Sequence, residues 1–136
     1  MLTQWNESLW GDEGFSALAV MRSFGETMGI VMRDTAPPLF YILGWIWGRM
    51  FGFDEVSLRS LSLLLMLGAA GFAGGIIYQI EKDKINAFLG FGLVFLTPFL
   101  MPFAFEWRMY ALLNFTVLGS VYFFVTRKWK LWVVLT

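Results

Sequence analysis

Two acidic clusters, far apart in the sequence, are the parts of this chain best suited to chemistry. Asp12 and Glu13 stand near the N-terminus, and Glu106 opens the segment Glu106-Trp107-Arg108-Met109-Tyr110. Both clusters flank long apolar runs. A carboxylate beside a membrane span is costly unless it is solvated, paired or used. If both clusters reach the same face of a membrane, they can form one acidic site at the water boundary.

The composition favours a polytopic membrane protein. Of 136 residues, 58% are hydrophobic and 15% are charged, against roughly 25% charged in soluble domains. The mean hydropathy is +0.66. The formal net charge is zero, so nucleic acid is not an expected partner. The chain contains no Cys and no His, which excludes thiol and imidazole chemistry. Catalysis would have to use carboxylates, Arg or Lys, Tyr, Ser or Thr, or a cofactor.

The apolar runs predict an all-α integral membrane fold. A span needs about 20 residues, and the run 37–51 is too short, so we expect it to lie at the interface or to enter the bilayer partway. A short helix is predicted over 14–24. Residues 1–56 would form an outer acidic loop with juxtamembrane helices, and 57–136 a transmembrane helical region. The predicted spans are 57–80, 85–105 and 109–126, followed by the start of a fourth helix.

The short loops predict the orientation. Lys and Arg in short loops favour the cytoplasmic side, and they gather at 81–84 and 127–130. Two crossings separate these loops, so both fall on one face. Asp12, Glu13 and Glu106 then share the extracytoplasmic face of a multi-pass protein in the cell membrane. This placement of the three acids on one face requires that the run 37–51 does not cross the membrane.

Glycines recur every fourth residue in two of the helical segments. Gly44, Gly48 and Gly52 follow this spacing in one segment, and Gly71 and Gly75 in the next. Stripes of small residues let helices approach closely in lipid. We expect tight packing at both stripes.

Four segments, in order along the chain, resemble motifs of one family. An acidic stretch is followed by a Pro-Pro-Leu-x-Tyr segment, a Phe-Gly-x-x-Glu segment with Arg and Ser, and a Glu-x-Arg-Met-Tyr corner. The segments are 8–16, 34–41, 51–62 and 106–113. Together they resemble the polyprenyl-phosphate-sugar-dependent glycosyltransferases of the C-type superfamily. That family includes the dolichyl-phosphate-mannose protein mannosyltransferases and the bacterial lipid A aminoarabinose transferases.

The resemblance implies transfer of a sugar from a polyprenyl-phosphate carrier to an acceptor on the outer face. The acceptor would be a lipid, a glycan or a protein. The likeness covers the front third of such an enzyme, so we expect an N-terminal fragment that is inactive alone. The chain departs from the family at Ala36, where members usually have His or Lys.

The resemblance also implies roles for individual residues. A carboxylate near the acceptor hydroxyl would remove its proton, which makes Asp12, Glu13 and Glu106 the expected catalytic residues. Departing phosphate needs a cation or a metal. No cofactor is certain, although a divalent cation could bind at Asp12 and Glu106. The expected substrate and phosphate contacts are Arg108, Arg33, Asp34 and Tyr110.

Simpler roles for the same residues stay open. Asp12 could cap a helix, and Glu13 could be a first-turn acid that favours the helix dipole. Glu106 could pair with Arg108, and Tyr110 could belong to an interfacial aromatic belt. Arg33 and Asp34 could form a solvated loop pair.

At 54–59, Asp54 and Glu55 are expected to cap a helix, with Arg59 as the partner four residues on.

The alternative function is a non-catalytic transporter or scaffold subunit. None of the three predicted spans contains the mid-span acid that a proton-coupled transporter would need.

Overall fold

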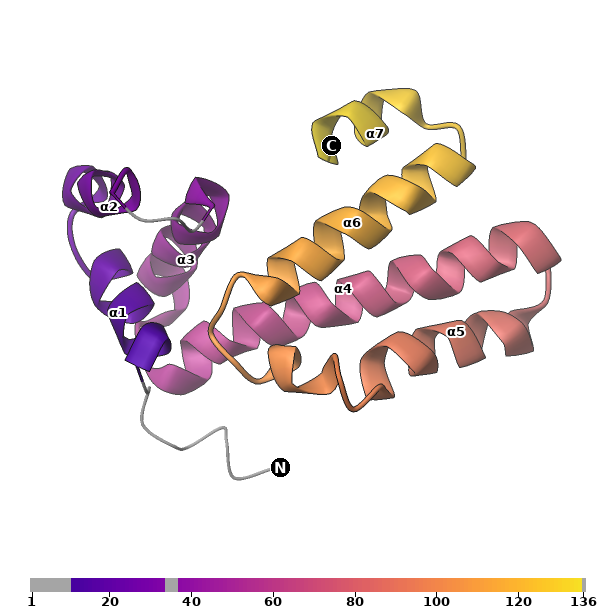
Figure 1. The fold of residues 1–136 in the computed structure, drawn as a ribbon, viewed down its shortest axis with the longest axis horizontal. Helices are drawn as coiled ribbons and strands as arrows, with labels where there is room; N and C mark the ends of the chain where they lie inside the picture. The colour runs from indigo at the N-terminus through magenta and orange to yellow at the C-terminus, as the bar shows by residue number, and fades with distance from the viewer. Residues whose placement is uncertain (1–10, 34–36, 136) are drawn as a thin grey trace. The chain divides into compact units, whose positions relative to one another are not determined.

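The computed structural model describes residues 11–33 and 37–135, with the side chains of Asp12 and Leu135 excepted. The predicted all-α class is confirmed, because 81% of the chain is helical and the described part contains no strand. The chain divides into two compact units, residues 1–62 with 105–109 and residues 63–104 with 110–136. The elements (Figure 1) are α1 Gly11–Val20, α2 Phe24–Val31, α3 Pro38–Phe51, α4 Glu55–Glu81, α5 Lys84–Leu96, the 3₁₀ helix η2 Met101–Ala104, α6 Tyr110–Val125 and α7 Trp129–Leu135.

Two short helices occupy the region where one helix over 14–24 was predicted. α1 ends at Val20, and α2 starts after Ser23. The Ser23 side chain accepts a hydrogen bond from the Glu26 backbone N–H, and the Glu26 carboxylate accepts one from the Ser23 N–H. This reciprocal capping box satisfies donors that a helix start leaves unpaired. It also lowers the pKa of Glu26, first through the Ser23 side-chain hydrogen bond.

Helix α3 packs against α1 and α2 in the first unit. It begins at Pro38, where a missing N–H costs nothing. It ends at Phe51 and is capped by Gly52, whose φ of 101° favours glycine. The predicted tight packing is found at Gly44 and Gly48 of the glycine stripe, but the close neighbours are aromatic rings rather than the backbone of another helix. A Cβ on Gly44 would lie 2.6 Å from the Trp107 indole, and one on Gly48 would lie 2.2 Å from the Phe53 ring.

Helix α4 is long and apolar enough to cross a membrane. At ~1.5 Å per residue, its 27 residues reach about 40 Å, more than the ~30 Å hydrocarbon core. The predicted cap is confirmed at its start, where the Ser57 N–H donates to the Asp54 carboxylate at 3.1 Å. Among the described residues, α4 alone passes this test, and α5 and α6 are shorter apolar helices.

Helix α5 ends at Leu96 rather than continuing to residue 105 as predicted. Pro98 is the physical reason, because the residue before a proline is pushed out of the helical region. Thr97 accordingly has a ψ of 124°. A short 3₁₀ turn, η2, follows the break. Helix α6 spans Tyr110–Val125, close to the predicted 109–126.

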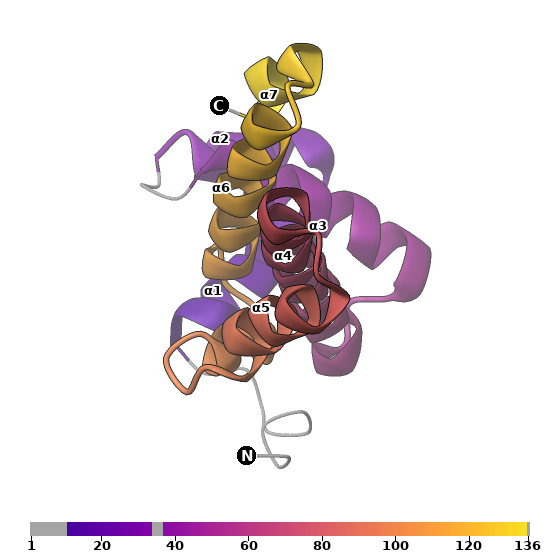
Figure 2. The ribbon, with the colours of Figure 1, turned by 90° about the vertical axis from the view of Figure 1, so that its right-hand side faces the viewer.

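Glycines in α4 set the packing of the second unit, where α5 and α6 lie beside α4 (Figure 2). A Cβ on Gly74 would lie 2.8 Å from the Ala87 carbonyl oxygen of α5, and one on Gly75 would lie 2.8 Å from the Tyr122 ring of α6. Gly71 differs from the prediction. It is exposed and has no neighbouring atom within 4 Å.

Candidate functional site

Glu13 is the central polar group of the first unit. It lies on the inner face of α1 together with Ala17 and Val20, four and seven residues on. This spacing brings three side chains onto one side of a helix. The Glu13 side chain is 2% exposed. A buried carboxylate is costly unless it is paired and hydrogen-bonded, so its partners decide what it does.

Two donors from distant segments satisfy Glu13. Its Oε2 lies 2.9 Å from Nη2 of Arg59, whose side chain is 3% exposed. Its Oε1 accepts a hydrogen bond of 2.5 Å from the backbone N–H of Trp107. The sequence predicted that Arg59 would pair with an acid in its own helix, but the structure pairs its guanidinium with Glu13 on α1. One carboxylate therefore joins α1, the start of α4 and the segment 105–109.

Trp107 anchors that segment. Its indole is fully buried and lies against the Phe40 ring of α3, with ring centroids 4.6 Å apart. The close approach is possible because Gly44 has no side chain. Because Trp107 is held on both its backbone and its ring, its neighbours Glu106 and Arg108 have fixed positions. Both neighbours are half-buried.

Glu106 has the electrostatics of a group that can exchange a proton. Burial, the first cause, and the charge of Glu13, the second, raise the pKa of the Glu106 carboxyl above its ordinary value of 4.5. Arg108 and Arg59 oppose this shift. Glu106, Glu13 and the two arginines therefore share one electrostatic site within the first unit. A carboxyl with a raised pKa is better suited to take a proton near neutral pH.

The other predicted site residues are not all in this cluster. Arg33 is exposed just after α2. Tyr110 opens α6 in the second unit, where its ring lies 4.8 Å from that of Phe103. Asp34 and Ala36 lie outside the described residues. So does the side chain of Asp12, although its backbone is the second residue of α1.

The metal site predicted at Asp12 and Glu106 therefore stays a prediction. In the part of the chain that the structure describes, no three acidic side chains gather in the way that a metal ion would require. The side chain of Asp12 is not in that part.

Sequence reasoning missed Arg59 and Trp107 as members of the site. Arg59 was the one charge in a predicted span, and a charge in that position calls for a partner. That signal was present, but it does not say which acid the partner is. The buried role of Trp107 had no signal of its own, since Trp is also common at membrane interfaces.

Comparison of the chain with protein-family models, curated proteins and solved structures finds no match. The likeness to the glycosyltransferases rests on its four segments alone.

Proposed function

We propose that this chain forms the outer-face site of a membrane glycosyltransferase that uses a polyprenyl-phosphate sugar as donor. The observation that supports the proposal is the packing in the first unit. The four segments that carry the family resemblance contribute Glu13, Phe40, Arg59 and Trp107, and these residues contact one another in series. Motifs that serve one site are expected to converge in this way.

The contacts suggest a division of labour between the acids. Both oxygens of Glu13 are bound within the fold and the side chain is buried, so we assign Glu13 a positioning role. Asp12, the preceding residue on α1, remains the proposed base for the acceptor hydroxyl. Glu106 would assist as a second proton-exchanging group. Arg108, which is held beside Trp107, would contact the donor phosphate, because charge-assisted hydrogen bonds to phosphate are strong.

The proposal includes a multi-pass arrangement in the membrane. Only 39% of the most apolar window of α4 is buried, so much of this helix can face lipid. Helix α5 also directs large apolar side chains outward, among them Phe88 at 74% and Leu93 at 68% exposure. Water-soluble surfaces seldom expose such an apolar face. Helices α5 and α6 are roughly 20 and 24 Å long at ~1.5 Å per residue, which is shorter than the hydrocarbon core. The residues that flank each helix would therefore have to complete its crossing of the bilayer.

A transfer assay tests the chemistry. The protein in its full natural length would be given a polyprenyl-phosphate sugar with a labelled sugar group, and sugar transfer would be measured in membranes. Asp12→Asn keeps the shape of the side chain but removes the base, so turnover should fall roughly 10²–10⁴-fold. Arg108→Ala should instead weaken donor binding. Glu81→Gln, an exposed acid of the second unit, is the matched control and should keep the rate.

A rate within threefold of wild type for Asp12→Asn would remove Asp12 from the chemistry. The absence of transfer with every polyprenyl-phosphate sugar tested would favour the alternative, a non-catalytic transporter or scaffold subunit.

A further inference from the structure

The turn between α6 and α7 holds a cation in an unusual backbone conformation. The Lys128 N–H donates to the Phe123 carbonyl at 2.9 Å, and the Arg127 N–H donates to the Phe124 carbonyl at 3.0 Å. These bonds form a Schellman motif, whose left-handed residue is usually glycine. Here that residue is Arg127, with a φ of 57°. The helix thus ends with an arginine where glycine would be easier, as α4 is followed by Lys82 with a φ of 58°.

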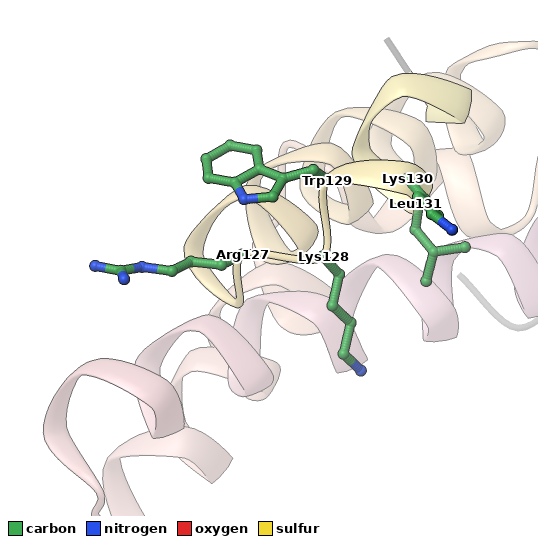
Figure 3. Close-up of a pocket in the computed structure, with 5 residues that line it drawn as sticks. All are labelled: Arg127, Lys128, Trp129, Lys130 and Leu131. Carbon is green, nitrogen blue, oxygen red and sulfur yellow. The ribbon is translucent and has the colours of Figure 1, made fainter.

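Three cations leave this turn for solvent. Arg127, Lys128 and Lys130 are exposed, and their side chains make no hydrogen bond or ion pair with any residue that the structure describes. Figure 3 shows Arg127 and Lys128 pointing away from each other, with Lys130 on the opposite side of the turn from Arg127. Donors that bind one phosphate would converge on it. Divergent cations instead match an extended surface that presents many separate anions.

Apolar groups accompany the three cations. Trp129 is 51% exposed and its indole lies edge-on to the Phe124 and Trp132 rings, at centroid distances of 5.4 and 6.1 Å. Residues 127–131 line an open pocket of about 490 Å³ whose surface is mostly apolar. An indole with this exposure suits the headgroup level of a bilayer. The turn therefore combines cations with an apolar surface, which matches an amphiphile better than a free inorganic anion.

We propose that Arg127, Lys128 and Lys130 bind the phosphate groups of anionic phospholipids in the adjacent leaflet, with Trp129 at headgroup depth. The complementarity of charge carries this proposal, because anionic leaflets attract basic segments next to a span. The proposal rests on the proposed membrane arrangement, in which α6 crosses the bilayer, but not on the glycosyltransferase assignment, since it uses only residues of the second unit.

Lipid selectivity measured by spin label tests the proposal. The full chain would be reconstituted in vesicles of phosphatidylcholine and phosphatidylglycerol, with a spin-labelled trace of one lipid or the other. The wild type should prefer phosphatidylglycerol. The combined variant Arg127→Gln, Lys128→Gln, Lys130→Gln should lower that preference at least about fivefold, the size expected for one cation at ~1 kcal/mol.

Two controls separate charge from other effects. The exchange Arg127→Lys, Lys128→Arg, Lys130→Arg keeps every charge and should keep the preference. Glu81→Gln with Lys82→Gln removes one acid and one cation from the loop 81–84 and leaves the net charge of that loop at zero, so it should change the preference little.

An unchanged preference in the glutamine variant, or a lost preference in the charge-preserving variant, would overturn the proposal. Displacement of the labelled lipid by inorganic phosphate, beyond the effect of chloride at equal ionic strength, would indicate a single-anion site and overturn it as well.

Discussion

Removing the guanidinium of Arg59 should destabilise the first unit strongly. Arg59→Met keeps an unbranched side chain but leaves Glu13, which is 2% exposed, without its cation. Breaking a buried ion pair by removing one partner costs about 3–5 kcal/mol, because the remaining charge stays buried. Since a small domain has only about 5–15 kcal/mol of stability in total, the loss should be large. Glu13→Met should cost more, because it strands Arg59 in the same way and also removes the acceptor of the Trp107 N–H.

The combined variant distinguishes a buried pair from a solvated one. Glu13→Met with Arg59→Met leaves no buried charge, and an apolar pair of similar volume can be nearly neutral. However, the Trp107 N–H donates to Glu13 at 2.5 Å and would lose its acceptor. A buried donor left unsatisfied costs about 1–3 kcal/mol. We therefore expect the double variant to be more stable than either single variant. Its free energy of unfolding should still be about 1–3 kcal/mol lower than that of the wild type.

Equilibrium unfolding in mixed micelles, followed by circular dichroism, would give the four free energies of the cycle. The control Arg22→Met removes an exposed arginine of the first unit and should cost under ~1 kcal/mol, as expected for a surface charge. If Arg59→Met also cost less than ~1 kcal/mol, or if the two single losses simply added, the pair would be solvated. The positioning role assigned to Glu13 would then be wrong.

Two further predictions concern packing and pH. Gly44→Ala would bring a methyl group 2.6 Å from the Trp107 indole and should destabilise the protein by about 1–3 kcal/mol. Gly71→Ala, at a position with open space around it, should instead stabilise α4 by up to ~1 kcal/mol. Equal effects of the two substitutions in the unfolding assay would contradict the packing described for Gly44. Because the pKa of Glu106 is raised in the folded state, the folded protein binds more protons than the unfolded chain above pH 4.5. The free energy of unfolding should therefore fall as the pH rises from 4.5 through the raised pKa. Glu106→Gln should flatten this slope, and an unaltered slope would assign it to another group.

Local patterns predicted the parts of the fold that depend on local physics. The all-α class followed from apolar runs of helical length, and the cap at Asp54 followed from an acid before a helix start. The break between α1 and α2 was also readable, because Ser23 and Glu26 have capping-box spacing. The end of α5 was readable from Pro98, but a hydropathy window treats proline as one more uncharged residue.

The assembly of the candidate site could not be predicted in the same way. Glu55 stands four residues before Arg59, so a local partner satisfied the sequence pattern. The partner in the structure, Glu13, is 46 residues away. Such a pairing depends on how α1 packs, which no period or spacing encodes. The fully buried Trp107 likewise depends on the space that Gly44 leaves in another helix.

The hydrogen bond from Trp107 to Glu13 constrains the order in which the chain can fold. It joins residues 94 positions apart, and the first unit is interrupted by residues 63–104 of the second. At about 5–20 residues per second, synthesis needs roughly 2–9 s to pass from residue 62 to residue 107. During that interval Glu13 has only its arginine, and the pocket for the indole is empty. The site around Glu13 is thus completed late, after the nascent chain has made the helices in between, and until then the Glu13 carboxylate lacks one of its two donors.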